Sequence, residues 1–119
     1  MDFFRICLMF FQRGLYMITK LNNRELFQFC EQFSIILRSG MSAIEGLAIL
    51  NDDSQTEWGK EILTFLYKDM EESGSLAHAM EQSGAFPASA AAYVRTGEET
   101  GCLDEVMKGL SAFYAKEIQ

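Results

Sequence analysis

Three corners of the same kind recur along the chain, and they constrain its fold more than any other feature. The stretches "SGMSAIEGL", "SGSLAHAM" and "TGCLDEVM" each place Ser or Thr before Gly, and a short run of small or apolar residues follows. Glycine adopts the left-handed backbone that closes a helix, and it leaves room for two helices to approach closely. The pattern therefore predicts three helix-turn-helix units in one chain.

Apolar residues between these corners recur at spacings of three and four, which is typical of helices with one buried face. Expected helix starts are Asn22 or Asn23, Ser42 with a capping box to Glu45, Thr56, Ser75, Pro87 and Leu103. The expected stops are Gly40, the polar cluster at 51–55, Gly74, Gly84 and Gly97. No stretch alternates strictly at period two, so strands are not required. The sequence predicts an all-α fold, a six-helix bundle.

The stretch "RTGEETGCLDEVM", residues 95–107, is the main candidate for a ligand site. Its glycines could present amides to a phosphate, but the acids around them would repel it: Glu98, Glu99, Asp104 and Glu105. Oxygens of Glu98, Asp104 and Glu45 could hold a hard cation, although the dense alternation of a calcium loop is missing. In the structural interpretation, Gly97 ends one helix and Gly101 permits the turn. We expect a helix corner here, with a cation site as the open alternative.

Composition argues against several classes of function. The formal net charge is −7 and no basic block occurs, so nucleic acid is not an expected partner. His78 is the only histidine, without a nearby nucleophile, and no nucleotide-binding motif is present. Cys7, Cys30 and Cys102 are far apart, which favours reduced thiols over a zinc site or a disulfide framework. We therefore expect no enzyme, no catalytic residues, no cofactor and no dedicated metal site.

The first segment, residues 1–21, is strongly apolar and is expected to be distinct from the helical domain at 22–119. Charged and polar residues interrupt it well below the ~20 residues that span a bilayer. One interpretation is a segment that lies on a membrane or partner surface through Phe3, Phe4, Phe10 and Phe11. The alternatives are a first helix that packs on the domain, or a translation start upstream of the folded part.

From about Glu25 to Glu117 the chain resembles the cytoplasmic domain of the type II secretion F proteins, platform subunits of the inner membrane that are shared with type IV pilus assembly. The most specific match is the family signature glycine-glutamate-x-serine-glycine-x-leucine, which stands here as "GEETGCL", residues 97–103. Earlier matches are the serine-glycine corner, the middle corner and an "FP" pair. The structural motif positions are Gly40, Gly74, Pro87, Gly97, Glu98, Gly101 and Leu103.

The resemblance implies a non-enzymatic scaffold at the cytoplasmic face of the inner membrane, which docks the assembly ATPase and other platform subunits. It also implies transmembrane helices that are absent from this chain, so we expect a fragment that ends before the membrane. Some members bind calcium through acids matching Glu45, Glu98 and the Cys102 position; a thiol removes one hard ligand, so we do not predict that site here. A homodimer through the last helices stays open. The alternative function is a helical ligand-sensing or regulatory bundle with a pocket between helices.

Overall fold

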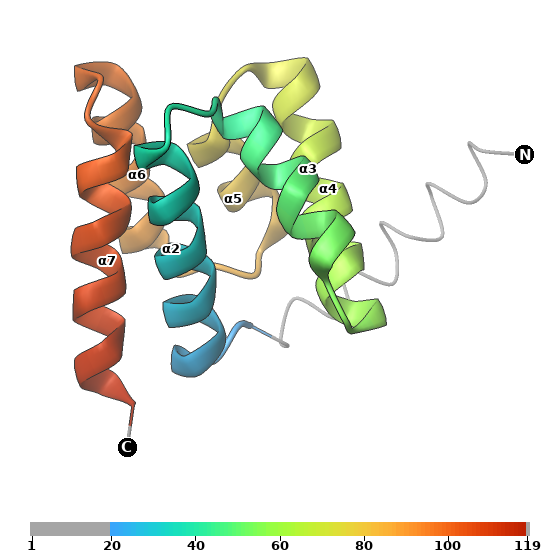
Figure 1. Cartoon of the computed structure of the whole chain (residues 1–119), viewed down its shortest axis with the longest axis horizontal. Helices are drawn as coiled ribbons and strands as arrows, with labels where there is room; N and C mark the ends of the chain where they lie inside the picture. Colours follow the sequence, from blue (N-terminus) through green and yellow to red (C-terminus); the bar gives the residue numbers. More distant parts are fainter. Residues whose placement is uncertain (1–19, 119) are drawn as a thin grey trace, which may run out of the picture.

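The structure, a computed structural model, describes residues 20–118, and this part of the chain forms six α-helices and no strand (Figure 1). The helices are α2 (Asn23–Arg38), α3 (Ala43–Asp53), α4 (Glu57–Ser73), α5 (Leu76–Ser83), α6 (Ala88–Thr100) and α7 (Leu103–Glu117). The all-α prediction is confirmed. The interpretations of residues 1–21 fall outside the described residues, except at Lys20 and Leu21. Within 20–118, no helix has the length and apolar character needed to cross a bilayer.

Side-chain caps explain where most of these helices begin. Ser42 caps α3, and Glu45 completes the predicted capping box by accepting from the Ser42 amide at 3.1 Å. Asn22 caps α2 in a second capping box, in which the Glu25 carboxylate accepts from the Asn22 amide at 2.9 Å. Thr56 and Ser75 cap α4 and α5 with their hydroxyls alone, which accept from the amides of Gly59 and His78. The sequence predicted the cap at Ser75.

The Ser-Gly and Thr-Gly corners close their helices as the sequence predicts. Gly74 and Gly101 have φ of 73° and 74°, a left-handed backbone that other residues adopt only with strain. The prediction that the fifth helix stops at Gly97 is wrong, because α6 continues to Thr100 and Gly101 forms its cap. Gly97 lies inside the helix and is buried.

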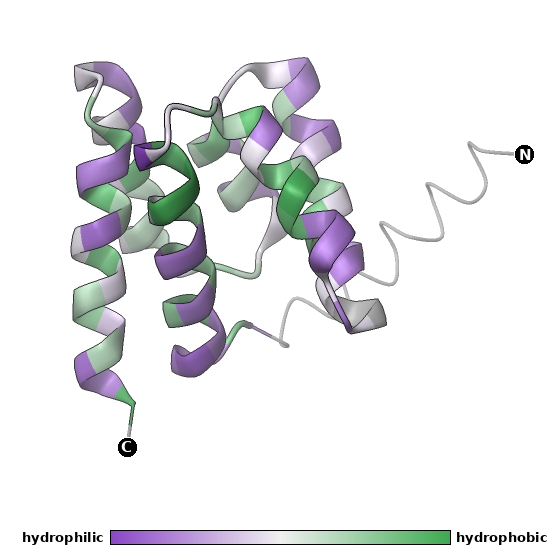
Figure 2. Cartoon of the chain, viewed as in Figure 1, coloured by the Kyte–Doolittle hydropathy of each residue, from purple (hydrophilic) through white to green (hydrophobic). Residues whose placement is uncertain are grey.

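The six helices pack in a closed order. Each helix contacts the next one along the chain, and α7 returns to pack on α2 in the most extensive helix pair. Figure 1 shows α2 and α7 side by side, with the α3–α4 hairpin on the other side of α2. Figure 2 shows both apolar and polar residues along most helices, as expected when each buries one face. Helices joined by the three corners contact each other, but so do the other neighbours, so the division into three units stays a prediction.

One apolar core joins all six helices. Its fully buried members include Phe33 from α2, Leu47 from α3, Leu66 from α4, Met80 from α5 and Met107 from α7. Leu21, just before α2, packs against this core, and its amide donates to the Ala85 carbonyl at 3.0 Å.

Candidate functional site

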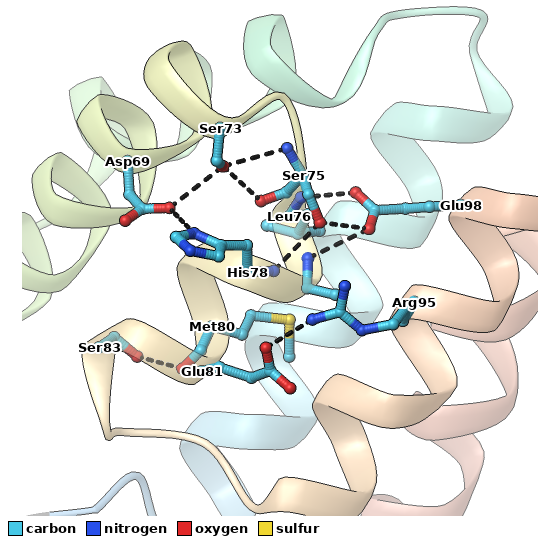
Figure 3. Close-up of polar contacts among 11 residues, drawn as sticks. Asp69, Ser73, Ser75, Leu76, His78, Met80, Glu81, Ser83, Arg95 and Glu98 are labelled. Carbon is cyan, nitrogen blue, oxygen red and sulfur yellow. Dashed lines mark hydrogen bonds and ion pairs between the residues drawn. The ribbon is translucent and has the colours of Figure 1, made fainter.

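The signature glutamate, Glu98, points from α6 to the N-terminus of α5 (Figure 3). One carboxylate oxygen accepts from the Ser75 hydroxyl at 2.8 Å and from the Ala77 amide at 3.3 Å. The other oxygen accepts from the Leu76 amide at 2.5 Å. The Ser75 hydroxyl in turn accepts from the His78 amide at 3.1 Å. Glu98 and Ser75 together thus satisfy the first three amides of α5.

This arrangement follows from the ends of α helices. The first amides of a helix have no partner inside it, and the aligned peptide dipoles place partial positive charge there. A carboxylate at this point gains from both effects. Because α5 has only 8 residues, it would be unstable as an isolated helix, and it depends on this cap together with the packing of its buried face, which includes Leu76 and Met80. Glu98 therefore acts as a cap that joins α5 to α6, two helices that are separated by the turn at residues 84–87.

A second polar group lies beside this cap and contains the only histidine. Nδ1 of His78 is 2.7 Å from the Asp69 carboxylate, and the Ser73 hydroxyl donates to the same oxygen at 3.2 Å (Figure 3). The His78 side chain is 44% exposed. The serine contacts the aspartate and not the imidazole, so these residues do not form the hydrogen bond of a nucleophile with its general base. The group instead connects α4 to the start of α5.

Gly97, next to the signature glutamate, is a site of close helix packing. A Cβ added there would lie 2.9 Å from Cγ2 of Val106 and 3.1 Å from Cα of Leu103. The Gly97 carbonyl also accepts from the Cys102 amide at 3.0 Å. Gly97 therefore lets α6 and α7 approach each other closely, directly beside the residue that caps α5.

The acids considered for a cation site have other roles in the structure. Glu45 is part of the capping box of α3, and Glu98 caps α5. Asp104 lies in the first turn of α7, where a negative charge is favourable. The Cys102 sulfur is 2.9 Å from the Thr100 hydroxyl oxygen. Across residues 20–118, no group of three or more His, Cys, Asp or Glu side chains could hold a metal ion.

A groove between α2, α3 and α4 is a surface feature that the sequence did not predict. Its volume is about 620 Å³. The floor is apolar, formed by half-buried or buried side chains: Phe29, Ile36, Leu50, Ile62, Leu63 and Phe86. Most of the polar side chains that line it, such as Gln28, Gln32 and Asp53, are exposed, as expected for a rim, whereas Glu25 and Ser54 are half-buried. An apolar floor with a polar rim is typical of a surface that receives a helix or peptide.

Comparison of the sequence with known proteins identifies the family of this chain. Residues 29–119 match the family described as "Type II secretion system (T2SS), protein F". The chain belongs to the type II secretion system protein F family. Residues 29–119 include every position of the structural motif, from Gly40 to Leu103, so the resemblance to this family is confirmed.

Two curated relatives agree with this assignment. The type IV pilus assembly protein PilC of Thermus thermophilus is 28% identical over 96 residues, which are 81% of this chain and 24% of the relative. The protein transport protein HofC homolog of Escherichia coli (strain K12) is 35% identical over 75 residues, 62% of this chain and 19% of the relative. The chain thus spans about a quarter or less of the length of these two relatives.

Proposed function

We propose that this chain is a non-enzymatic scaffold domain in the inner-membrane platform of a type II secretion or type IV pilus machine. In this role it docks the assembly ATPase and other platform subunits at the cytoplasmic face of the membrane. The observation that carries the proposal is the use of the family signature: Glu98 and Gly97 hold three helices together. Because the residues of the signature stabilise the packing of the helices, they fit a protein whose role is to present a rigid surface to its partners.

Two further observations support a docking role over the alternative of a ligand-sensing bundle. Most of the polar side chains of the groove are exposed, whereas small-molecule sites direct polar groups into an enclosed pocket. Large apolar side chains are also exposed on α6 and α7, where Tyr93 is 61% and Phe113 is 56% accessible. Exposed aromatic residues are common anchors of protein interfaces.

The proposal is tested by binding of the full chain to the purified assembly ATPase from the same genome, measured by isothermal titration calorimetry. We expect saturable binding that is weakened by Tyr93→Asp or Phe113→Asp. Ser89→Asp, an exposed change on α6, is the matched control and leaves the affinity unchanged. Sedimentation of the same samples separates this result from self-association through α6 and α7. Absence of binding to the ATPase and to every other platform subunit of that genome contradicts the docking role.

A further inference from the structure

The groove between α2, α3 and α4 follows one face of α2. The residues of α2 that line it recur at spacings of three and four, from Glu25 through Phe29 and Gln32 to Ile36. At a rise of about 1.5 Å per residue, this stretch of α2 is about 17 Å long. The opposite wall comes from the second half of α3 and the first half of α4. A groove of this length fits about three turns of another helix.

The groove is acidic at one end. Figure 1 shows that α2 and α3 meet at the corner formed by residues 39–42 and lie farther apart toward the start of α2 and the end of α3. Glu25, in the first turn of α2, and Asp53, the last residue of α3, line this open end. Ile35 and Ile36 line the end near the corner, and no lysine or arginine of the described residues lines the groove.

The charges of these two carboxylates are not neutralised within residues 20–118, where neither carboxylate forms an ion pair. One oxygen of Glu25 accepts from the Asn22 amide at 2.9 Å, which leaves its other oxygen available. Asp53 follows Asp52 at the C-terminus of α3, where the peptide dipoles already place partial negative charge. A carboxylate is unfavourable there for the helix itself, and a bound cationic group would reduce the repulsion.

We propose that the groove receives an amphipathic helix of another platform subunit, and that the apolar stripe of this helix ends in lysine or arginine residues. The stripe packs on the apolar floor, and the basic residues pair with Glu25 and Asp53 at the open end. Opposite charges at the rim of an interface select the partner and its orientation more than they add affinity. The inference rests on the docking role proposed above, and it adds a second surface to the exposed aromatic residues of α6 and α7.

Charge favours this occupant over a second copy of the chain. The formal net charge is −7, so two copies repel each other, and the repulsion is strongest where both charged groups of the site are acidic. An acidic helix would meet the same repulsion. A neutral helix would leave Glu25 and Asp53 without partners at the interface, which costs affinity.

The probe is a fluorescein-labelled peptide of about 14 residues, which is about four helical turns. It carries leucines at the spacing of one helix face and lysines beyond one end of that stripe, and a second peptide has glutamates in place of the lysines. Fluorescence anisotropy measures binding to the full chain at about 0.15 M salt, where charges more than about 8 Å apart are largely screened. We expect saturable one-to-one binding of the lysine peptide and about ten-fold weaker binding of the glutamate peptide.

Asp53→Lys tests the acidic end, and Asp52→Lys is its matched control. Both positions are exposed in the last turn of α3 and both substitutions change the net charge equally, but only Asp53 lines the groove. We expect Asp53→Lys to weaken binding of the lysine peptide about five-fold and to remove its preference over the glutamate peptide. Asp52→Lys should change the affinity less than about two-fold. Equal effects of the two substitutions overturn the proposal, because net charge and not the groove would then attract the peptide.

Ile35→Asp tests the apolar end of the groove. Its control, Phe113→Asp, matches in charge and in exposure, at 56% against 54%, but lies on α7 outside the groove. We expect Ile35→Asp to weaken binding of the lysine peptide about ten-fold and Phe113→Asp to leave it unchanged. Unchanged affinity in Ile35→Asp, or no saturable binding of the lysine peptide, overturns the proposal. Self-association of the natural chain that Ile35→Asp abolishes in sedimentation identifies a second copy as the occupant and also overturns it.

Binding of the purified platform subunits separates this inference from the docking role itself. We expect Asp53→Lys and Ile35→Asp to weaken binding of at least one subunit, and Asp52→Lys to leave it unchanged. If the subunits bind the natural chain and all three variants alike, the inference about the groove fails while the docking role stands. If no subunit binds although the lysine peptide occupies the groove, the docking role fails and the preference of the groove for a basic helix stands.

Discussion

Glu45 and Glu98 are both glutamates at helix corners, but they stabilise the fold in different ways. Glu45 is exposed and accepts from Ser42, three residues earlier, within the first turn of its own helix. Glu98 is half-buried and accepts from Leu76, which is 22 residues away and belongs to another helix. The first carboxylate stabilises α3 alone, whereas the second joins α6 to α5.

This difference separates local structure from tertiary structure. Each helix must satisfy the amides of its first turn, and a residue within that turn can do so without the rest of the fold. A cap from a neighbouring helix works only when both helices are already in place. Loss of Glu98 should therefore affect the whole domain, and loss of the Glu45 box should affect mainly α3.

The largest effect is expected for Glu98→Ala. The Leu76 and Ala77 amides lose a charged acceptor at a half-buried site, and a hydrogen bond to a charged group contributes about 1.5–3 kcal/mol. We expect the free energy of unfolding to fall by about 2 kcal/mol in urea denaturation followed by circular dichroism. Glu99→Ala, its exposed neighbour, is the control and should change stability by less than about 0.5 kcal/mol. Equal effects of the two substitutions would show that Glu98 is not a tertiary cap.

Gly97→Ala tests whether close packing of α6 on α7 positions that cap. The added methyl group meets Val106 and the backbone of Leu103, and overpacking of this kind costs about 1–3 kcal/mol. The higher helix propensity of alanine offsets part of this loss of stability. We expect a net loss of about 1 kcal/mol in the same urea experiment.

Gly109→Ala is the matched control for this substitution. Gly109 also lies inside a helix, α7, but a Cβ there meets nothing within 4 Å. The replacement should stabilise the domain by up to about 1 kcal/mol. A stabilising effect at both positions would contradict the packing role of Gly97.

Ser42→Ala tests the local side of the comparison. It removes the hydroxyl that accepts from the Glu45 amide at 3.3 Å, and loss of a serine N-cap costs about 1 kcal/mol. Hydrogen exchange should show the loss of protection mainly in α3, because the contacts of the box stay within one turn. Ser89→Ala, at an exposed position of α6 that makes no cap, is the control. Equal loss of protection in α5 and α7 would argue against a local role.

The same comparison explains how much of the fold could be predicted. The box of Ser42 and Glu45, the caps at Thr56 and Ser75 and the stop at Gly74 are local, so spacing along the sequence is sufficient to find them. The box formed by Asn22 and Glu25 was missed although it has the same three-residue spacing. From such local features the bounds of the six helices can be predicted to within a few residues.

The contacts of Gly97 and Glu98 and the groove could not be predicted from the spacing of residues along the sequence. Gly97 was assigned as a helix stop because glycine favours helix ends, but Thr100 and Gly101 repeat the pattern of the other corners and were the better signal. The partner of Glu98 could not be found, because it requires the position of α5 against α6. The groove was missed for a related reason, since three helices contribute its lining.

The smallest expected effect concerns the pH dependence of the local cap. Hydrogen bonds from the Ser42 amide and hydroxyl stabilise the charged form of Glu45 and lower its pKa below the ordinary value of 4.5. A lowered pKa contributes stability above pH 4.5, and this contribution is lost as the pH falls through the pKa of the folded state. The stability difference between the natural chain and Glu45→Gln should therefore shrink between neutral pH and pH values below the pKa of the folded state.

The titration of Glu45 itself, followed by NMR, checks the cause. Ser42→Ala removes the hydroxyl donor but keeps the amide, so the pKa of Glu45 should move part of the way back toward its ordinary value. Ser89→Ala should leave the titration unchanged, since Ser89 lies on another helix. A pKa of Glu45 that is already ordinary in the natural chain would mean that the exposed capping box does not favour the charged form. Glu45 and Glu98 would then differ in the strength of their hydrogen bonds as well as in the sequence separation of their partners. Only the half-buried Glu98 would form stable hydrogen bonds to the amides that it caps.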